Sequence, residues 1–489
     1  MVILKLPHWC IFFALSLLWH PSLSAQTKLQ SQVMELLQSS VLKGADVGLS
    51  VKNLQSGQEL FALNKNRLMV PASNIKIITT GAALYYLLPD YKFYTEIYGD
   101  MDDEGVVAGD LWIKGHGDPW LLPEKVWYIT TQLKRLGLKK VRGRIIADGS
   151  YFAPPHHARG SEQDSSSAAY MSVAGGLSVG FNAMGIHVKP AKQIGQPALI
   201  SFEPSNHYVK TEGHIMTVSA QTSKLLVDTV NELEKSTVWL SGHINIEDKP
   251  KVKWRKVSPA ALYAGEIFKA LMQEQGIEIA GKVEQGFVPK KASEIFKYGS
   301  LPLSEIVLKV NQFSNNFMAA QLARVLGAEV MGVPGTWSKG VQVMDAFLDK
   351  MGIASGTYVL GNASGLHDVN AFSVGQISQV LEFMYRQRHL RTEFLASMAV
   401  AGSSGTLKER MRQAEAQYYL RGKTGTLSSA SALSGYVVNK DGEDLVFAFI
   451  VNHYRSPLAD VWNLQDKLGN LLAGSSRDSA LVVGARSNP

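Results

Sequence analysis

Cysteine is almost absent from this sequence of 489 residues, and the single thiol, Cys10, lies close to the N-terminus. The rest of the chain therefore cannot supply a thiolate nucleophile, a thiolate metal ligand or a disulfide. No His-Glu-x-x-His or His-x-x-Glu-His pattern is present, and the pair Gly115-x-Gly117 is too short for a dinucleotide-binding loop. We expect neither a metal nor a cofactor.

Long apolar runs are also missing beyond the N-terminus. Lys5 precedes the apolar run Ile11 to Trp19, and the small residues up to Ala25 follow it. The run is too short to span a bilayer, which favours a signal peptide, residues 1–25, over an uncleaved anchor. We expect export across the inner membrane to the periplasm, and no stable membrane span after the signal peptide is removed.

The sequence lacks a dense stripe of Lys and Arg. Without the first 25 residues, 48 basic and 42 acidic side chains remain, a mild excess for so long a chain. Nucleic-acid binding is therefore not expected. The excess is compatible with weak attraction to an anionic envelope polymer, or simply with a basic soluble surface.

Helical and strand patterns are distributed unevenly along the chain. Helix and hairpin patterns lie at both ends, whereas short β-rich runs broken by glycine fill the segment from about residue 93 to 297. We expect a discontinuous domain of residues 26–92 and 298–475, an inserted accessory region of one or two subdomains over residues 93–297, and a flexible tail over residues 476–489.

Individual elements follow from periodicity and turn residues. We expect helices over residues 28–44, 261–275, 304–310, 317–326 and 459–473, and a helix that starts near Ser73 and stops at Pro89. Hairpins are expected over residues 47–63 and 433–451, and an exposed loop over residues 160–167.

The pair Ser73 and Lys76 opens the most apolar of these helices. Residues three apart share one face of a helix, so the two side chains should be neighbours. A desolvated lysine can take the proton of a serine hydroxyl, and unpaired N–H groups at a helix start can stabilise an oxyanion. The pattern is weak alone, since Ser40 and Lys43 repeat it on what we interpret as a solvated face.

Two further patterns, each occurring once, follow in the sequence: Ser314-Asn315-Asn316 and Lys423-Thr424-Gly425-Thr426. The first lies between two expected helices, and the second would present a cation and a hydroxyl along a strand. In this order, and behind a signal peptide, the three patterns resemble the motif set of penicillin-binding proteins and serine β-lactamases.

The long spacing between the first two motifs, together with several other stretches, indicates which family within this group the chain resembles. Ser73 and Ser314 are 241 positions apart, far more than in a compact β-lactamase. The chain resembles the D-alanyl-D-alanine carboxypeptidase/endopeptidase family of low-molecular-mass penicillin-binding proteins, of the penicillin-binding protein 4 type. The stretches that carry this likeness are residues 71–76, Gly115-His116-Gly117-Asp118-Pro119, Leu177-Ser178-Val179-Gly180-Phe181-Asn182 and Ala401-Gly402-Ser403-Ser404-Gly405-Thr406-Leu407.

The resemblance implies an α/β fold: a transpeptidase-like domain with an antiparallel five-stranded sheet flanked by helices, and a large β-rich insertion. It also implies that Ser73 is acylated by the penultimate D-alanine of a peptidoglycan stem peptide. Lys76 would take the proton of Ser73, Ser314 would relay a proton to the leaving amine, and Asn316 would orient Lys76 and the substrate amide.

Substrate binding is implied for the last motif. Lys423 and Thr424 would bind the substrate carboxylate, and the backbone N–H groups of Ser73 and Thr426 would form the oxyanion hole, where each donor contributes about 3–4 kcal/mol in other serine hydrolases. The partners implied are stem peptides, and β-lactam antibiotics as inhibitors that leave a slow acyl-enzyme. The resemblance implies that Asp148 binds a substrate ammonium; the alternative is an Asp that caps a turn.

One stretch departs from the family pattern. Where the family has Asp-Gly-Ser-Gly-Leu-Ser-Arg, this chain has residues 362–368, Asn-Ala-Ser-Gly-Leu-His-Asp, so a cation is replaced by Asp368. The alternatives are a drifted surface loop and an altered substrate preference.

Two other functions stay open from the sequence. A β-lactamase or esterase on the same scaffold is disfavoured, because no Glu-x-x-Leu-Asn segment follows Ser73 to supply a second deacylation base. A catalytically idle cell-wall binding module is disfavoured because every reactive group is present.

Overall fold

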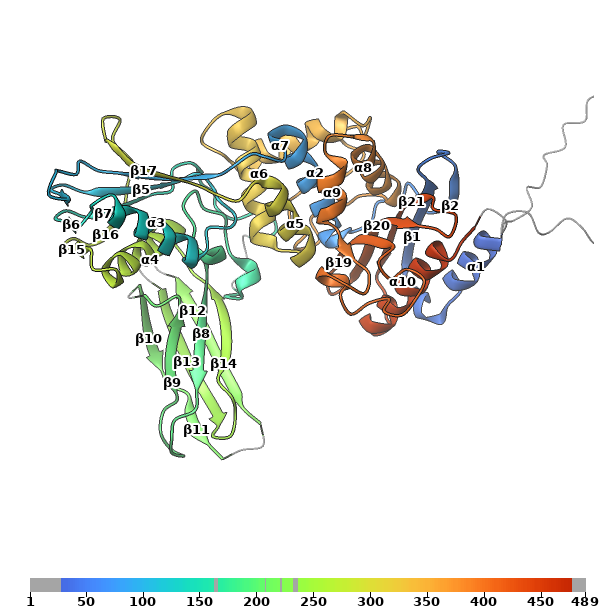
Figure 1. Ribbon diagram of the computed structural model, residues 1–489. Helices are drawn as coiled ribbons and strands as arrows, with labels where there is room; N and C mark the ends of the chain where they lie inside the picture. Colours follow the sequence, from blue (N-terminus) through green and yellow to red (C-terminus); the bar gives the residue numbers. More distant parts are fainter. Residues whose placement is uncertain (1–27, 162–165, 207, 220–221, 232–235, 477–489) are drawn as a thin grey trace, which may run out of the picture.

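The computed structural model describes residues 28–161, 166–206, 208–219, 222–231 and 236–476. The expected signal peptide and nearly all of the expected tail lie outside these residues. Figure 1 shows an elongated body from which an arm of β-strands projects on one side. One end of the body combines the N-terminal and C-terminal segments, and the other end and the arm come from the middle of the chain.

An antiparallel sheet forms the core of the end that contains both chain termini. Its strand order is β18 (Ala399–Val400), β19 (Leu420–Thr426), β20 (Ala430–Val438), β21 (Asp444–Asn452), β1 (Asp46–Asn53) and β2 (Glu59–Leu63). Strands β19 to β2 are the five expected from the family resemblance, and β18 adds a two-residue sixth strand at one edge. Both expected hairpins, β1–β2 and β20–β21, are confirmed.

Helices cover both faces of this sheet, which is why β20 and β21 are almost continuously buried rather than alternating. Helices α1 (Lys28–Leu37) and α10 (Leu458–Ala473) pack on one face. The other face carries a larger helical layer: α2 (Ile75–Leu87), α5 (Leu303–Phe313), α6 (Asn316–Met331), α7 (Trp337–Asp349), α8 (Val374–Arg386) and α9 (Arg391–Ser397). α2 is buried over most of its length and lies at the centre of this layer.

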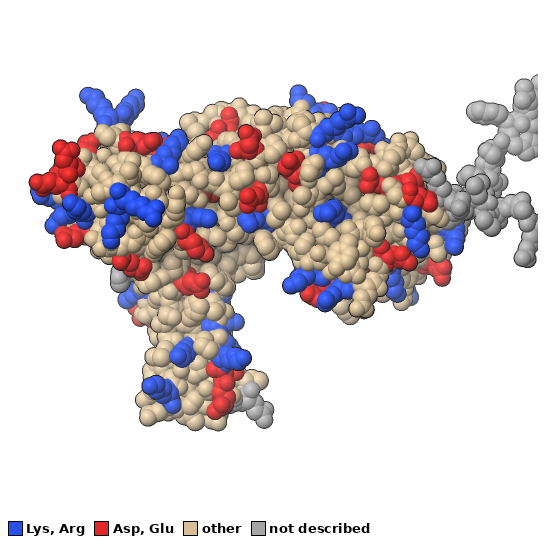
Figure 2. All heavy atoms as spheres, in the orientation of Figure 1, with Lys and Arg blue, Asp and Glu red and all other residues tan. Residues whose placement is uncertain are grey.

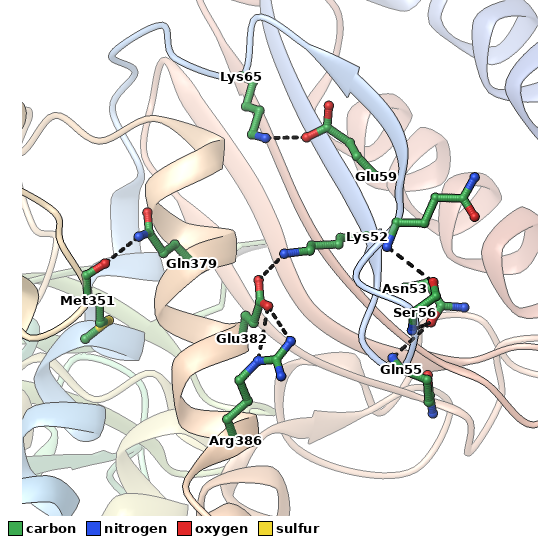
Figure 3. A network of polar contacts seen from close by, with 11 residues as sticks. Lys52, Asn53, Gln55, Ser56, Glu59, Lys65, Met351, Gln379, Glu382 and Arg386 are labelled. Carbon is green, nitrogen blue, oxygen red and sulfur yellow. Dashed lines mark hydrogen bonds and ion pairs between the residues drawn. The ribbon is translucent and has the colours of Figure 1, made fainter. Parts of the chain in front are cut away.

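Helix α8 is tied to the sheet by a charged contact as well as by apolar packing. Figure 3 shows Lys52 of β1 pointing at Glu382 of α8, with Nζ and Oε2 2.6 Å apart, and Arg386 on the far side of the same carboxylate. In the same view, Oδ1 of Asn53 accepts hydrogen bonds from the backbone of Gln55 and Ser56. This Asx turn reverses the chain between β1 and β2, as the turn residues predict.

The part of the body formed by the middle of the chain has its own sheet, with strand order β16 (Val283–Gln285), β7 (Ile145–Asp148), β5 (Leu111–Gly115), β3 (Tyr94–Tyr98) and β17 (Glu294–Gly299). A small sheet of β15 (Glu278–Ile279), β6 (Lys140–Val141) and β4 (Val106–Val107) lies beside it. Helices α3 (Pro123–Arg135) and α4 (Ala260–Glu274) pack on these strands. The sequence predicted α4 but not α3.

The arm consists of two further sheets that share one apolar core. In the first, β13 (Ser236–Asn245) pairs with β10 (Val209–Gly213), β11 (Met216–Val218) and β12 (Lys224–Asn231). In the second, β8 (Ala183–Lys189) lies between β14 (Lys251–Lys256) and β9 (Leu199–Glu203).

Within the described residues, none of the helices combines the length and apolar character needed to cross a bilayer. Lys, Arg, Asp and Glu are interspersed on the face shown in Figure 2, without a single basic stripe.

Candidate active site

Ser73 lies on a 3-10 turn, Ala72–Asn74, that leads directly into α2. The α-helix expected from the sequence therefore begins two residues after Ser73 rather than before it. Lys76 is in the first turn of α2, and its Nζ lies 3.0 Å from Oγ of Ser73. The two side chains are therefore neighbours, as predicted.

Lys76 is completely buried in the helical layer. Its Nζ contacts three oxygens: Oγ of Ser73, Oδ1 of Asn316 at 2.8 Å and the backbone carbonyl of Ser364 at 2.5 Å. Burial, and secondly the charge of Lys423, lower the pKa of Lys76 well below its usual value. A neutral amine has two N–H groups and one lone pair. The carbonyl oxygens of Asn316 and Ser364 can accept both N–H groups, which leaves the lone pair for the hydroxyl of Ser73.

The second motif occupies the break between α5 and α6. Ser314 ends α5 in the left-handed conformation, with φ of 54°, and Asn315 caps α6 by accepting a hydrogen bond from the backbone N–H of Met318. Asn316 is then the first residue of α6. Because the chain turns sharply between the two helices, Ser314 at the end of α5 and Asn316 at the start of α6 both lie near Ser73, although they are far from it in the sequence.

Lys423 projects from β19 and is also completely buried. Its Nζ donates hydrogen bonds to Oγ of Ser314 at 2.8 Å and to the carbonyl of Thr424 at 2.7 Å. Burial lowers the pKa of Lys423 to about 7. The structure thus brings the five residues predicted to be catalytic together in two hydrogen-bonded groups, Ser73–Lys76–Asn316 and Ser314–Lys423, which the short segment from Ser314 to Asn316 joins.

The end of β19 passes close to the turn that carries Ser73. A Cβ atom on Gly425 would lie 2.9 Å from the carbonyl oxygen of Pro71 and 3.0 Å from the backbone nitrogen of Ser73, so glycine permits this approach. Thr424 donates or accepts a hydrogen bond with Thr406, with 2.8 Å between the two Oγ1 atoms. Thr426, two residues after Thr424, is exposed. The two-residue strand β18 pairs with β19 only at Arg421 and Gly422, so it does not cover this part of the edge.

The segment that departs from the family pattern lies against Lys76. Asn362 and Ser364 are buried, whereas Asp368 is exposed, so the surface-loop interpretation fits only the end of the segment. Oδ1 of Asn362 accepts hydrogen bonds from the backbone N–H groups of Ser364 and Gly365, at 3.2 and 2.9 Å. This turn directs the carbonyl of Ser364 to Lys76. A Cβ on Gly365 would lie 1.9 Å from the carbonyl oxygen of Ala72.

Asn362 and Ser364 are therefore site residues that the motifs did not reveal. The sequence did indicate the turn itself, since Asn with Ser and Gly two and three residues later is typical of an Asx turn. Nothing in the sequence, however, indicates that this turn contacts a lysine nearly 290 positions away.

The middle segment of the chain also contacts the site. The carbonyl of Tyr170 accepts a hydrogen bond from Nδ2 of Asn316 at 3.4 Å, and the carbonyl of Arg159 accepts one from Nδ2 of Asn362 at 3.2 Å. The two carboxylate oxygens of Asp148 accept hydrogen bonds from the backbone N–H groups of Ser150 and Val288. These are contacts of a residue that caps turns, and the binding of a substrate ammonium by Asp148 stays a prediction.

A buried cation connects α6 to this middle segment. Arg324 is fully buried on the same helix as Asn316, and it donates hydrogen bonds to the carbonyls of Ala153, Pro155 and Gly335. Its guanidinium also lies over the ring of Phe152, 4.7 Å from the centroid. Burial lowers the pKa of Arg324 to about 10. The contacts fix residues 152–155 against α6.

Comparisons with known proteins agree with the motif set. The family model described as the D-Ala-D-Ala carboxypeptidase 3 (S13) family matches residues 29–473. A D-alanyl-D-alanine carboxypeptidase from Actinomadura sp. (strain R39) is 30% identical over 447 residues, covering 88% of this chain and 82% of that protein. The D-alanyl-D-alanine carboxypeptidase DacB of Haemophilus influenzae is 24% identical and covers 90% of this chain and 92% of its own.

The fold has a solved counterpart as well. The crystal structure of penicillin binding protein 4 (dacB) from Haemophilus influenzae superimposes with a TM-score of 0.79 at 23% identity, covering 91% of this chain and 99% of that chain. The expected α/β architecture with a large β-rich region is confirmed. Because the family model matches residues 29–473, this chain belongs to the D-Ala-D-Ala carboxypeptidase 3 (S13) family.

Proposed function

We propose that this protein is a serine D-Ala-D-Ala carboxypeptidase, and also an endopeptidase, that cleaves peptidoglycan stem peptides through an acyl-enzyme on Ser73. The observation that carries the proposal is the environment of Lys76. A buried amine with a lowered pKa lies 3.0 Å from a serine hydroxyl, and two carbonyl oxygens are placed to accept its N–H groups. This arrangement suits a general base next to a nucleophile.

Acylation would begin at the carbonyl of the penultimate D-alanine. Oγ of Ser73 forms a bond to that carbon while its proton moves to Nζ of Lys76. The C–N bond to the terminal residue then breaks, and the leaving amine takes a proton through Ser314, which is hydrogen-bonded to Lys423. Proton donation to the leaving amine is necessary because an amide anion is too basic to depart.

Residues of β19 would bind the negatively charged terminal carboxylate of the substrate. Lys423 supplies positive potential when it is protonated, and the hydroxyl of Thr424 donates to the terminal carboxylate. The backbone N–H groups of Ser73 and Thr426 are proposed as the oxyanion hole. The close approach of β19 to the Ser73 turn, which Gly425 permits, supports this placement.

Deacylation would follow the same path in reverse, with water in place of the amine. Water adds to the ester carbon and gives a proton to Lys76, which passes it to Oγ of Ser73 as the Ser73–acyl bond breaks. Carboxypeptidase and endopeptidase reactions share both steps and differ only in the leaving amine, which is free D-alanine in one case and a cross-linked stem peptide in the other. A β-lactam would acylate Ser73 in the same manner and leave slowly.

We further propose a division of labour along the chain. Residues 26–92 and 298–475 form the catalytic domain, residues 93–297 form the accessory region, and residues 1–25 direct export to the periplasm and are then removed. Hydrogen bonds from Asn316 and Asn362 to carbonyls of the accessory region support a role for that region at the site.

Release of D-alanine from a soluble stem pentapeptide tests the proposed activity. The wild-type protein should release it, and Ser73→Ala should not. Ser40→Ala is a matched control, because Ser40 and Lys43 repeat the motif spacing but are exposed on the far side of the sheet from α2. Equal release by the wild type and Ser73→Ala would overturn the proposal.

A further inference from the structure

An exposed tryptophan stands in the middle of the arm. Trp239 of β13 has 52% of its surface exposed, although most residues on the opposite face of that strand are buried in the core of the arm. In the sheet register, Trp239 lies between Glu212 of β10 and Asp228 of β12. The outer face of this sheet therefore presents an indole flanked by two carboxylates.

A hollow of about 490 Å³ adjoins this tryptophan. Polar and charged side chains share its lining with apolar ones: Ser167, Leu226, Asp228, Trp239, Ser241 and Arg255. Arg255 is held by hydrogen bonds from its guanidinium to the carbonyls of Val227 and Trp254. Asp228 forms no ion pair with any residue that the structure describes. Donors, acceptors and one flat ring thus converge in a concave site large enough for one or two sugar rings.

The hollow is linked to the catalytic cluster through one short segment. The carbonyl of Ser167 accepts a hydrogen bond from the backbone N–H of Lys256 at 2.8 Å, and Ala168 pairs with Arg255. Two residues later, Tyr170 contacts Asn316. Two residues span at most about 7 Å, so the rim of the hollow lies close to the site. Figure 2 shows the surface deeply notched between the arm and the body.

The length of a stem peptide limits how far the glycan can lie from Ser73. Four residues of a stem peptide, counted to the bond that is cleaved, span at most about 14 Å when extended. A sugar chain that carries such a peptide would therefore lie roughly one stem length from Ser73 while the peptide occupied the cluster. The segment with Ser167 and Tyr170 lies between the two places.

We propose that this hollow binds the glycan strand of peptidoglycan, with a sugar ring stacked on Trp239 and its hydroxyl groups hydrogen-bonded to Asp228, Ser241 and Arg255. The inference rests on the proposed function and identifies where the enzyme holds the polymer that carries its substrate. Sugar rings combine weakly apolar C–H faces with many hydroxyl groups, which an indole surrounded by polar side chains complements. A lipid surface fits less well, because the indole borders a hollow whose lining includes the charged side chains of Asp228 and Arg255.

The test uses the full-length mature protein and glycan strands from which an amidase has removed all stem peptides. Such strands contain no D-alanine, so binding cannot occur through Ser73. The wild type should bind them, and Trp239→Ala should weaken binding about tenfold. Trp127→Ala is a matched control: Trp127 is 53% exposed but lies on α3, and its removal should leave the affinity unchanged.

Acylation by benzylpenicillin, measured on the same samples, separates this inference from the proposed function. All three proteins should be acylated at the same rate, which also shows that the variants are folded. Asp228→Asn provides a second variant and should weaken glycan binding while leaving acylation intact. No binding by the wild type, equal binding by wild type and Trp239→Ala, or binding through Trp239 to anionic lipid vesicles alone would each overturn the glycan site.

Discussion

Nζ of Lys76 lies 3.0 Å from Oγ of Ser73, and the side chain of Lys76 is completely buried. The contact joins a residue of α2 to the 3-10 turn before it, and the two remaining neighbours of the amine are carbonyl oxygens. A serine and a lysine at this separation are common on protein surfaces. Burial makes this pair chemically different, because it favours a neutral amine, and the two acceptors hold that amine with its lone pair available to the hydroxyl of Ser73.

Replacing Lys76 by Met should slow acylation of Ser73 by about 10²–10⁴-fold, the usual contribution of a general base. The side chain keeps its length and apolar stem, so the fold should persist. Stopped-flow measurement of acylation by a chromogenic β-lactam checks the rate, and circular dichroism checks the fold. Replacing the exposed Lys43 of the second Ser-x-x-Lys match by Met should have no effect on the rate; a comparable loss there would contradict the assignment.

The pH dependence should show two opposite effects. Lys76 acts without its proton, so acylation should fall as the pH drops through its lowered pKa. Lys423 binds a carboxylate through its charge, so KM for a peptide ending in a carboxylate should rise as the pH increases above about 7. The same peptide with a terminal amide has no carboxylate for Lys423 to bind, so its KM should not change over this pH range. Parallel curves for the two peptides would contradict the role of Lys423.

Asn362 should act as a positioning residue. Replacement by Ala removes the acceptor for the N–H groups of Ser364 and Gly365, and should lower the free energy of unfolding by about 1–3 kcal/mol. Since the carbonyl of Ser364 would no longer be fixed on Lys76, kcat should fall more than KM rises. Asn362→Asp keeps one acceptor oxygen and should recover most of kcat. A pure loss of stability, with kcat unchanged in the folded fraction, would argue against positioning.

Arg324 should stabilise the join between α6 and residues 152–155. Arg324→Met leaves the carbonyl of Ala153 without the guanidinium and that of Gly335 with only the backbone N–H of Ala153, and should cost about 1–3 kcal/mol in urea unfolding. Arg324→Lys keeps the charge but not the planar fork, so it should recover only part of the loss. Stability equal to the wild type in Arg324→Met would show that the buried cation contributes nothing net.

The sequence predicted which residues come together at the candidate site better than it predicted the framework that holds them. Ser73, Lys76, Ser314, Asn316 and Lys423 were found because each motif is local, and a family pattern connects the three motifs. The hairpins β1–β2 and β20–β21 were found because turn residues and alternation are local as well.

Features that depend on tertiary contacts were not found. The apolar pattern of α3 lies among strand-like runs, and its helical character follows from packing against α4. Asn362 and Arg324 act on residues far away in the sequence, and no local pattern reports such contacts. The assignment of Asp148 rested on position in the sequence alone; its carboxylate accepts hydrogen bonds from two backbone N–H groups, and its role with a substrate stays a prediction.

Intact-mass analysis after incubation with benzylpenicillin tests the central claim most directly. The mature protein should gain the mass of one penicilloyl group, Ser40→Ala should gain the same mass, and Ser73→Ala should gain none. An adduct that persists in Ser73→Ala, or no adduct on the folded wild type, would contradict Ser73 as the nucleophile and favour a binding protein without catalysis.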